Sequence, residues 1–184
     1  MTDLIAAAKA KPGMVAFGST EQATLPFLVG HAISEATGVT FQHVPFNQPA
    51  TAIQSLVKGD LQYYVDGIAP LLPLVKSGRM RAIAVTTDKR LPGLEDIPLV
   101  KDVVPGYVAV GWFALLGPKA LPADMVQKIN RDMNQVLALP EVVSKYRDIS
   151  LFSTPRTQAE SSALMKAEVE RWAAVIKKVG LEAQ

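Results

Sequence analysis

The sequence contains no cysteine and only two histidines among its 184 residues. The lack of cysteine excludes disulfides, thiolate catalysis and zinc sites built on cysteine. His31 and His43 have no Asp, Glu or His neighbours at metal-ligand spacing. We therefore interpret both as ordinary hydrogen-bonded histidines rather than as metal ligands or catalytic bases. No metal ion and no other cofactor is expected.

A strong charge imbalance and long apolar runs are also missing. The formal net charge is +2, with acidic and basic residues mixed along the chain, so nothing indicates a nucleic acid or an anionic membrane surface as partner. No apolar run reaches the roughly 18 residues of a membrane span. Residues 1–5 have neither the basic region nor the apolar stretch of a signal peptide, so we expect no export signal in this chain.

Catalytic signatures are absent as well. The sequence has no nucleophile elbow of the G-x-S-x-G kind, no phosphate-binding P-loop and no G-x-G-x-x-G fingerprint. Because no nucleophile–base pair and no metal-ligand set can be assembled from it, we expect that the protein is not an enzyme.

The first half of the sequence alternates between helical and strand patterns. Apolar residues at helical spacing predict helices over residues 3–11, 22–37, 49–58 and 70–76. Short apolar runs between them predict strands over residues 14–18, 39–46, 61–65 and 81–87. The last of these is almost continuously apolar, which favours a parallel sheet covered by helices. The predicted fold class is α/β, with a mostly parallel sheet flanked by helices.

The second half changes character. Residues 88–106 are rich in proline, glycine and charge, which predicts a long connecting loop with one short helix. An apolar strand is predicted over residues 108–116, followed by helices over residues 122–137 and 140–147. Thr154 is the predicted cap of the last helix, with Pro155 at its first position. That helix is expected to bury an apolar face that includes Trp172.

Polar residues follow each of the first three predicted strands. They are Ser19, Thr20, Gln22 and Thr24, then Phe46 and Asn47, then Asp66 and Gly67. In open parallel sheets, ligands bind beyond the carboxyl ends of the strands, where helix N-termini offer unpaired N–H groups. These eight residues are the candidate ligand site. The same residue types also form turns and helix caps, so spacing alone leaves both interpretations open.

Several sequence blocks, taken in chain order, resemble one known family. They are residues 4–13 (LIAAAKAKPG), 43–46 (HVPF), 59–62 (GDLQ), 78–87 (GRMRAIAVTT), 105–107 (PGY) and 111–118 (GWFALLGP). They are similar to the Bug, or TctC-type, receptors of tripartite tricarboxylate transporters, over essentially the whole chain. The resemblance implies a periplasmic, type II periplasmic-binding-protein-like protein. Its two α/β lobes would close over a small organic ligand, commonly a carboxylate, and deliver it to membrane transporter subunits.

The resemblance also assigns roles within the candidate site. The family's binding loop is matched by residues 20–24, its V-P-[YF] loop by residues 44–47 and its strand-end aspartate by Asp66. Two departures concern the ligand. Of the family's G-x-G-[ST]-x-x-H stretch only Thr24 remains, with Glu21 close by, and Asn47 replaces the usual lysine. These changes weaken the case for an ordinary dicarboxylate and admit a neutral, amide-bearing or cationic ligand.

The resemblance further implies how the chain is divided. Residues 1–110 would form the second, ligand-binding lobe. Residues 111–184 would form the crossover strand and C-terminal helices of a first lobe whose N-terminal part the chain lacks. An unpaired apolar strand invites pairing with another chain, so we expect a homodimer or strand exchange. An alternative is a cytoplasmic ligand-sensing or regulatory domain on the same scaffold, which the missing export signal favours.

Overall fold

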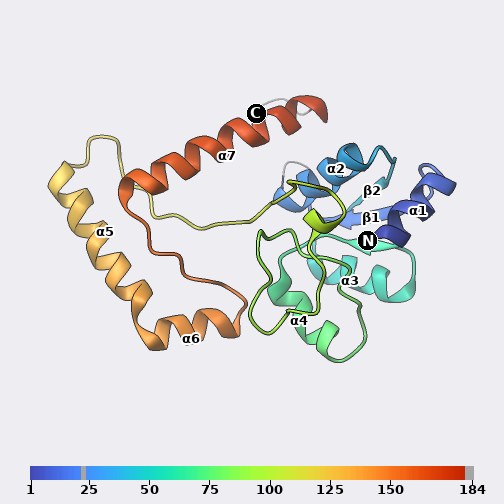
Figure 1. The fold of residues 1–184 in the computed structure, drawn as a ribbon, viewed down its shortest axis with the longest axis horizontal. Helices are drawn as coiled ribbons and strands as arrows, with labels where there is room; N and C mark the ends of the chain where they lie inside the picture. Colours follow the sequence, from blue (N-terminus) through green and yellow to red (C-terminus); the bar gives the residue numbers. More distant parts are fainter. Residues whose placement is uncertain (22–23, 181–184) are drawn as a thin grey trace. The chain divides into compact units, whose positions relative to one another are not determined.

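The computed structural model describes residues 1–21 and 24–180 and has an α/β fold (Figure 1). Its strands are β1 (Ala16–Ser19), β2 (Gln42–Pro45) and β3 (Tyr63–Tyr64). Its helices are α1 (Thr2–Ala10), α2 (Leu25–Thr37), α3 (Pro49–Lys58), α4 (Ile68–Lys76), the 3₁₀ helix η1 (Val100–Asp102), α5 (Ala123–Ala138), α6 (Pro140–Asp148) and α7 (Gln158–Lys178). The strands are parallel in the order β2-β1-β3, which confirms the predicted class.

Local sequence sets the ends of the helices in the first half. Gly38 and Gly59 follow α2 and α3 with φ angles of 64° and 87°. Glycine adopts this left-handed conformation without steric cost, so each residue stops its helix. Pro49 occupies the first turn of α3, as expected.

The predicted start of the last helix is wrong. The helix begins at Gln158, and Thr157 caps it instead of Thr154. The Thr157 backbone N–H donates to Glu160 Oε2 at 2.7 Å, and the Glu160 N–H donates to Thr157 Oγ1 at 3.2 Å. This reciprocal capping box needs a glutamate three residues after the cap, which Thr154 lacks.

Two predicted strands do not form as strands. Residues 81–87 make one isolated bridge, between Val85 and Leu99, because their neighbour is the connecting loop and not a second strand. In the other predicted strand, residues 108–116, the Ala109 N–H donates to the Thr86 carbonyl at 2.8 Å, and residues 110–116 make no hydrogen bond to any other described backbone group. Both segments were predicted as strands from their apolar pattern, but a strand also needs a partner with its own free backbone groups.

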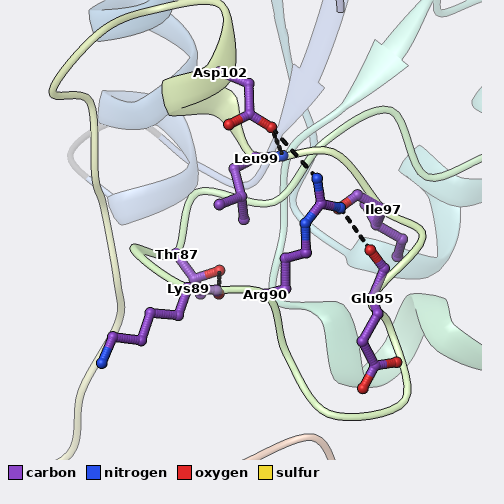
Figure 2. A network of polar contacts seen from close by, with 7 residues as sticks. All are labelled: Thr87, Lys89, Arg90, Glu95, Ile97, Leu99 and Asp102. Carbon is purple, nitrogen blue, oxygen red and sulfur yellow. Dashed lines mark hydrogen bonds and ion pairs between the residues drawn. The ribbon is translucent and has the colours of Figure 1, made fainter.

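The connecting loop is organised around Arg90 (Figure 2). Its guanidinium group donates to the backbone oxygens of Glu95, at 2.5 Å, and Ile97, at 3.2 Å. It also lies 3.8 Å from the carboxylate of Asp102, which accepts a hydrogen bond from the Leu99 N–H at 3.1 Å. One side chain thus satisfies two loop carbonyls. The short helix predicted in this loop is η1.

The core of the sheet is centred on Phe17, which has no exposed surface. A Cβ atom at Gly30 of α2 would lie 2.3 Å from the Phe17 ring, closer than real contacts allow. Only glycine lets α2 come this near to β1. Phe17 also stacks on Tyr63, with ring centroids 5.4 Å apart, so it joins the helix to both the central strand and β3.

Both histidines belong to this core. The His31 and His43 ring centroids are 5.9 Å apart, and both rings contact Phe17 and Phe27. Burial lowers the pKa of both imidazoles, and the charge of His31 lowers that of His43 further. His43 Nε2 lies 2.8 Å from Ser19 Oγ, so the interpretation as an ordinary hydrogen-bonded histidine is confirmed for His43. Nε2 of His31 has no hydrogen-bond partner among the described residues.

The chain divides into two compact units. Unit 1 comprises Met1–Gly111 together with the end of the chain from Val175, and unit 2 comprises Trp112–Ala174. Every buried apolar residue that the structure describes lies in unit 1, at or before Ala109. In unit 2 even large apolar side chains are exposed, such as Phe113 at 91% and Leu115 at 70%. The expected burial of an apolar face of the last helix is therefore not observed: no residue of α7 is buried.

No helix within the described ranges combines the length and the apolar character required to cross a bilayer.

Replacing Gly30 by alanine is expected to destabilise unit 1 by about 1–3 kcal/mol, because the added methyl group overpacks against Phe17. This loss outweighs the roughly 1 kcal/mol that alanine gains over glycine in a helix. The measurement is urea unfolding of the natural chain, Gly30→Ala, Phe17→Leu and the double variant. If Phe17 causes the loss, Gly30→Ala costs less in the Phe17→Leu background. Equal costs in both backgrounds would contradict this explanation.

The free energy of unfolding is expected to fall as the pH drops below about 6.5, the ordinary histidine value. Both histidines have a lowered pKa when folded, so the unfolded chain binds more protons there and gains stability relative to the fold. The stability is complete above that pH. Carboxylates with lowered pKa values, such as Glu95 and Glu160, act only at lower pH.

The measurement compares urea midpoints at about pH 7.5 and about pH 5.5. The double variant His31→Phe with His43→Gln should lose most of the difference between the two midpoints, because it has neither titrating imidazole. Glutamine is chosen at position 43 because it can still donate a hydrogen bond to Ser19. Identical midpoints for the natural chain at both pH values would show that the histidines do not resist protonation.

Candidate functional site

The carboxyl ends of the three strands come out side by side at one edge of the sheet. β1 pairs with β2 up to Ser19 and Pro45, and with β3 up to Gly18 and Tyr64. The ladder continues one step beyond the strands. The Phe46 N–H donates to the Ser19 carbonyl at 3.0 Å, and the Val65 N–H donates to the Gly18 carbonyl at 3.1 Å. The loops that carry the candidate residues therefore start next to one another.

Two aromatic rings meet at the end of β1 because Gly18 has no side chain. A Cβ atom there would lie 3.2 Å from the Phe46 ring, 3.2 Å from the Tyr64 ring and 2.6 Å from Leu61. Side chains alternate between the faces of a strand, so these groups lie on the face opposite Phe17. They form an apolar wall next to the strand ends.

Asp66 is fixed by two donors. The Tyr64 hydroxyl donates to its Oδ2 at 2.6 Å and the Gly67 N–H donates to its Oδ1 at 2.7 Å. Burial, followed by the hydrogen bond to Asp66 and its charge, raises the pKa of Tyr64 well above its usual range, so Tyr64 stays a donor. Asp66 is half-buried, and each of its oxygens keeps a lone pair for a further donor.

Ser19 lies inside the site but is not open to a ligand. Its side chain is completely buried, and its hydroxyl donates to the Thr20 carbonyl at 2.8 Å. Since that hydroxyl has one proton, the 2.8 Å contact with His43 requires Nε2 of His43 to carry the hydrogen. Ser19 thus links the histidine core to the start of the first loop, and a ligand role for it stays a prediction.

The two threonines of the first loop make hydrogen bonds within it. The Thr20 hydroxyl lies 3.3 Å from that of Thr24, which donates to the Glu21 carbonyl at 2.8 Å. Thr24 is also the residue before the first turn of α2, but its side chain makes no capping bond to the helix. Gln22, another predicted site residue, lies outside the described residues.

The second and third loops present their residues to solvent. Asn47 is exposed and its amide makes no hydrogen bond within residues 1–21 and 24–180, while Phe46 beside it is half-buried. Gly67 is exposed and directly precedes α4. The structure therefore brings Thr20, Phe46 and Asp66 to one edge of the sheet, each from a different strand, and leaves Asn47 free to contact a ligand.

Two members of this arrangement were not predicted. Tyr64 orients Asp66 through its hydroxyl group. In an extended segment, residues two apart lie on the same side of the chain, so the sequence could have indicated this contact. His43 holds Ser19, and this pairing had no local signal because the two residues come from different strands.

A hollow elsewhere in unit 1 is less suited to bind a polar ligand. Its volume is about 410 Å³, and it is lined by His31, Ser34, Glu35, Gly38, Val39, Thr40, Val175, Lys178 and Val179. Its two charged side chains, Glu35 and Lys178, form an ion pair with each other. It lies at the C-terminal end of α2, away from the strand ends.

Within the described ranges, no group of three or more potential metal-ligating side chains comes together. The chemistry available at the edge of the sheet is hydrogen bonding and apolar contact.

Comparison with known proteins gives the same family throughout. The sequence profile of the tripartite tricarboxylate transporter family receptors matches residues 1–181. BugT of Bordetella pertussis is 26% identical over 96% of this chain and 55% of its own length. A UPF0065 protein of Pseudomonas knackmussii is 31% identical over 81% of this chain and 89% of its own length. The chain spans about half the length of most such relatives, for example 48% of a UPF0065 protein of Bordetella bronchiseptica.

Solved structures agree in fold. Rpa4515 of R. palustris, determined with adipate, is 28% identical and superposes with a TM-score of 0.84 over 98% of this chain and 60% of that one. MatC of Rhodopseudomonas palustris, with bound malate, is 22% identical with a TM-score of 0.78 over 96% of this chain and 61% of that one; at this identity it supports the fold alone. The periplasmic-binding-protein fold and the extent of the profile match together show that the chain belongs to the tripartite tricarboxylate transporter family of receptors.

Proposed function

We propose that this protein is an extracytoplasmic solute-binding protein that captures a small organic ligand, with a carboxylate or a related group, at the carboxyl ends of β1, β2 and β3. The observation that carries the proposal is the convergence of three strand-end loops around the rings of Phe46 and Tyr64. Parallel sheets bind ligands at such an edge, and an apolar wall with a few fixed polar groups is the usual composition of a small-molecule site.

The contacts proposed for the ligand follow from exposure. Asn47 and Gly67 are exposed, and Thr20, Thr24, Phe46 and Asp66 are half-buried, so each has a surface that a ligand can reach. Ser19 would act through the position of the Thr20 carbonyl, and Gln22 is included on the sequence alone. The ligands of relatives support the class of compound, because Rpa4515 was determined with adipate.

The wider setting is proposed from the family. The ligand would be delivered in the periplasm to the membrane subunits of a tripartite tricarboxylate transporter. Residues 1–110 would act as the ligand-binding lobe, and residues 111–184 would belong to the other lobe. The exposed apolar residues of unit 2, such as Phe113 and Leu116, are consistent with the expected homodimer or strand exchange.

A thermal-shift screen against small carboxylates, amides and amines tests the binding function. A ligand present at about 100 times its Kd stabilises the folded chain by about 2.7 kcal/mol, which raises the Tm of a chain of this size by roughly 5–10 °C. The mass in solution is recorded in parallel, and a monomer at high concentration would count against the homodimer.

Asn47→Ala should weaken the ligand found in this screen by roughly 5- to 30-fold, the value of one or two lost hydrogen bonds. The folded chain should keep its Tm, since the Asn47 side chain is exposed and unbonded. Gln42→Ala is the matched control, because Gln42 is an exposed amide at the opposite end of β2. Equal weakening by both variants would place the ligand elsewhere.

A further inference from the structure

Ser19 is the residue that ties the first two strand-end loops together. Its carbonyl group accepts a hydrogen bond from the Phe46 N–H, at the start of the second loop, at 3.0 Å. Its hydroxyl group donates to the Thr20 carbonyl, at the start of the first loop, at 2.8 Å. The residue has no exposed surface, so solvent does not compete for its hydroxyl group.

His43 supplies the donor that fixes this hydroxyl group. The hydroxyl has one proton, which it gives to Thr20, so its 2.8 Å contact with Nε2 of His43 needs a hydrogen on that nitrogen. The imidazole ring packs against the rings of Phe17 and Phe27, with centroids 4.8 Å away in both cases, which restricts its movement. A serine side chain has three staggered rotamers, and the bond from His43 favours the one that reaches Thr20.

The consequence for the first loop is a fixed peptide plane between Thr20 and Glu21. No peptide bond within the described ranges is cis, and the carbonyl and N–H of a trans peptide point in opposite directions. Since the Thr20 carbonyl is turned toward the Ser19 hydroxyl, the Glu21 N–H is turned away from it. The Glu21 carbonyl is held as well, by the Thr24 hydroxyl at 2.8 Å. The direction in which this loop presents its backbone therefore depends on hydrogen bonds inside the protein.

We infer that His43 is a positioning residue for ligand binding: acting through Ser19, it sets the orientation of the Thr20–Glu21 peptide and with it the shape of the first loop. The inference rests on the proposed binding function, to which it adds a residue of the aromatic core. The alternative is a purely structural role, in which the bond from His43 stabilises the sheet and leaves ligand affinity unchanged. The two roles differ in whether affinity depends on this hydrogen bond.

Two substitutions at position 43 separate the roles. His43→Gln keeps an N–H donor for Ser19, whereas His43→Met provides a side chain without one. Adipate and succinate are titrated calorimetrically, together with the compound that gives the largest shift in the thermal-shift screen, and the Tm of each ligand-free variant is recorded. His43→Met should weaken binding by about five- to tenfold, the effect of one lost neutral hydrogen bond, and His43→Gln should restore it to within about twofold.

Ser19→Ala tests whether His43 acts through Ser19. This variant should weaken binding to a similar extent, and adding His43→Met to it should cost no further affinity, because the group that His43 holds is already missing. Ser34→Ala is the matched control. Ser34 is another serine whose hydroxyl donates to a backbone carbonyl, that of Val39, but it lies near the C-terminal end of α2. This control should lower the Tm and leave the affinity unchanged.

Each outcome decides between the roles. Affinities that fall equally in both His43 variants, or in neither, overturn the inference and leave the binding function standing. So does a further loss when His43→Met is added to Ser19→Ala, which would mean that His43 acts by another route. If His43→Met does not fold, equal affinities of Ser19→Ala and Ser34→Ala overturn the inference. If no compound binds the natural chain, the proposed function is wrong and the inference falls with it.

Discussion

The contact between Phe17 and Gly30 is the constraint on which unit 1 depends. Phe17 lies in the middle of the central strand and is fully buried, and α2 reaches it only because position 30 has no side chain. The position of α2 relative to β1 determines where the loop between them runs. That loop is the first of the three strand-end loops that make up the candidate site. A packing requirement deep in the core therefore influences the geometry of the surface proposed to bind a ligand.

A second glycine does the same on the other face of β1. Gly18 makes room for Phe46 and Tyr64, which come from the two flanking strands. The central strand thus alternates a large residue, a glycine and the buried Ser19. On one face of the sheet the Phe17 ring packs against α2, and on the other face the rings of Phe46 and Tyr64 occupy the space that Gly18 leaves. The carboxylate of Asp66 is fixed through one of these neighbours, Tyr64, so the core and the site share residues.

Much of this could be predicted from local sequence. Helix periodicity and the glycines at positions 38 and 59 predicted the helices of unit 1, and the strand-end rule grouped Thr20, Phe46 and Asp66. What could not be predicted depends on distant partners. The rings around Gly18 and the bond between His43 and Ser19 join different strands. Most of the predicted strand over residues 108–116 finds no backbone partner among the described residues. The predicted cap at Thr154 was an avoidable error, because Glu160, three residues after Thr157, indicates a capping box at Thr157.

The division of the chain has a consequence for spectroscopy. The sequence has two tryptophans, Trp112 and Trp172, and both fall in unit 2, whereas the candidate site and the core belong to unit 1. Tryptophan emission therefore reports on the surroundings of unit 2. The aromatic signal of the site comes from tyrosine, above all from Tyr64, whose hydroxyl is bonded to a carboxylate. Three of the four tyrosines belong to unit 1 and Tyr146 belongs to unit 2. Tryptophan emission is therefore the signal that is specific to one unit, and it can follow the unfolding of unit 2 without any label.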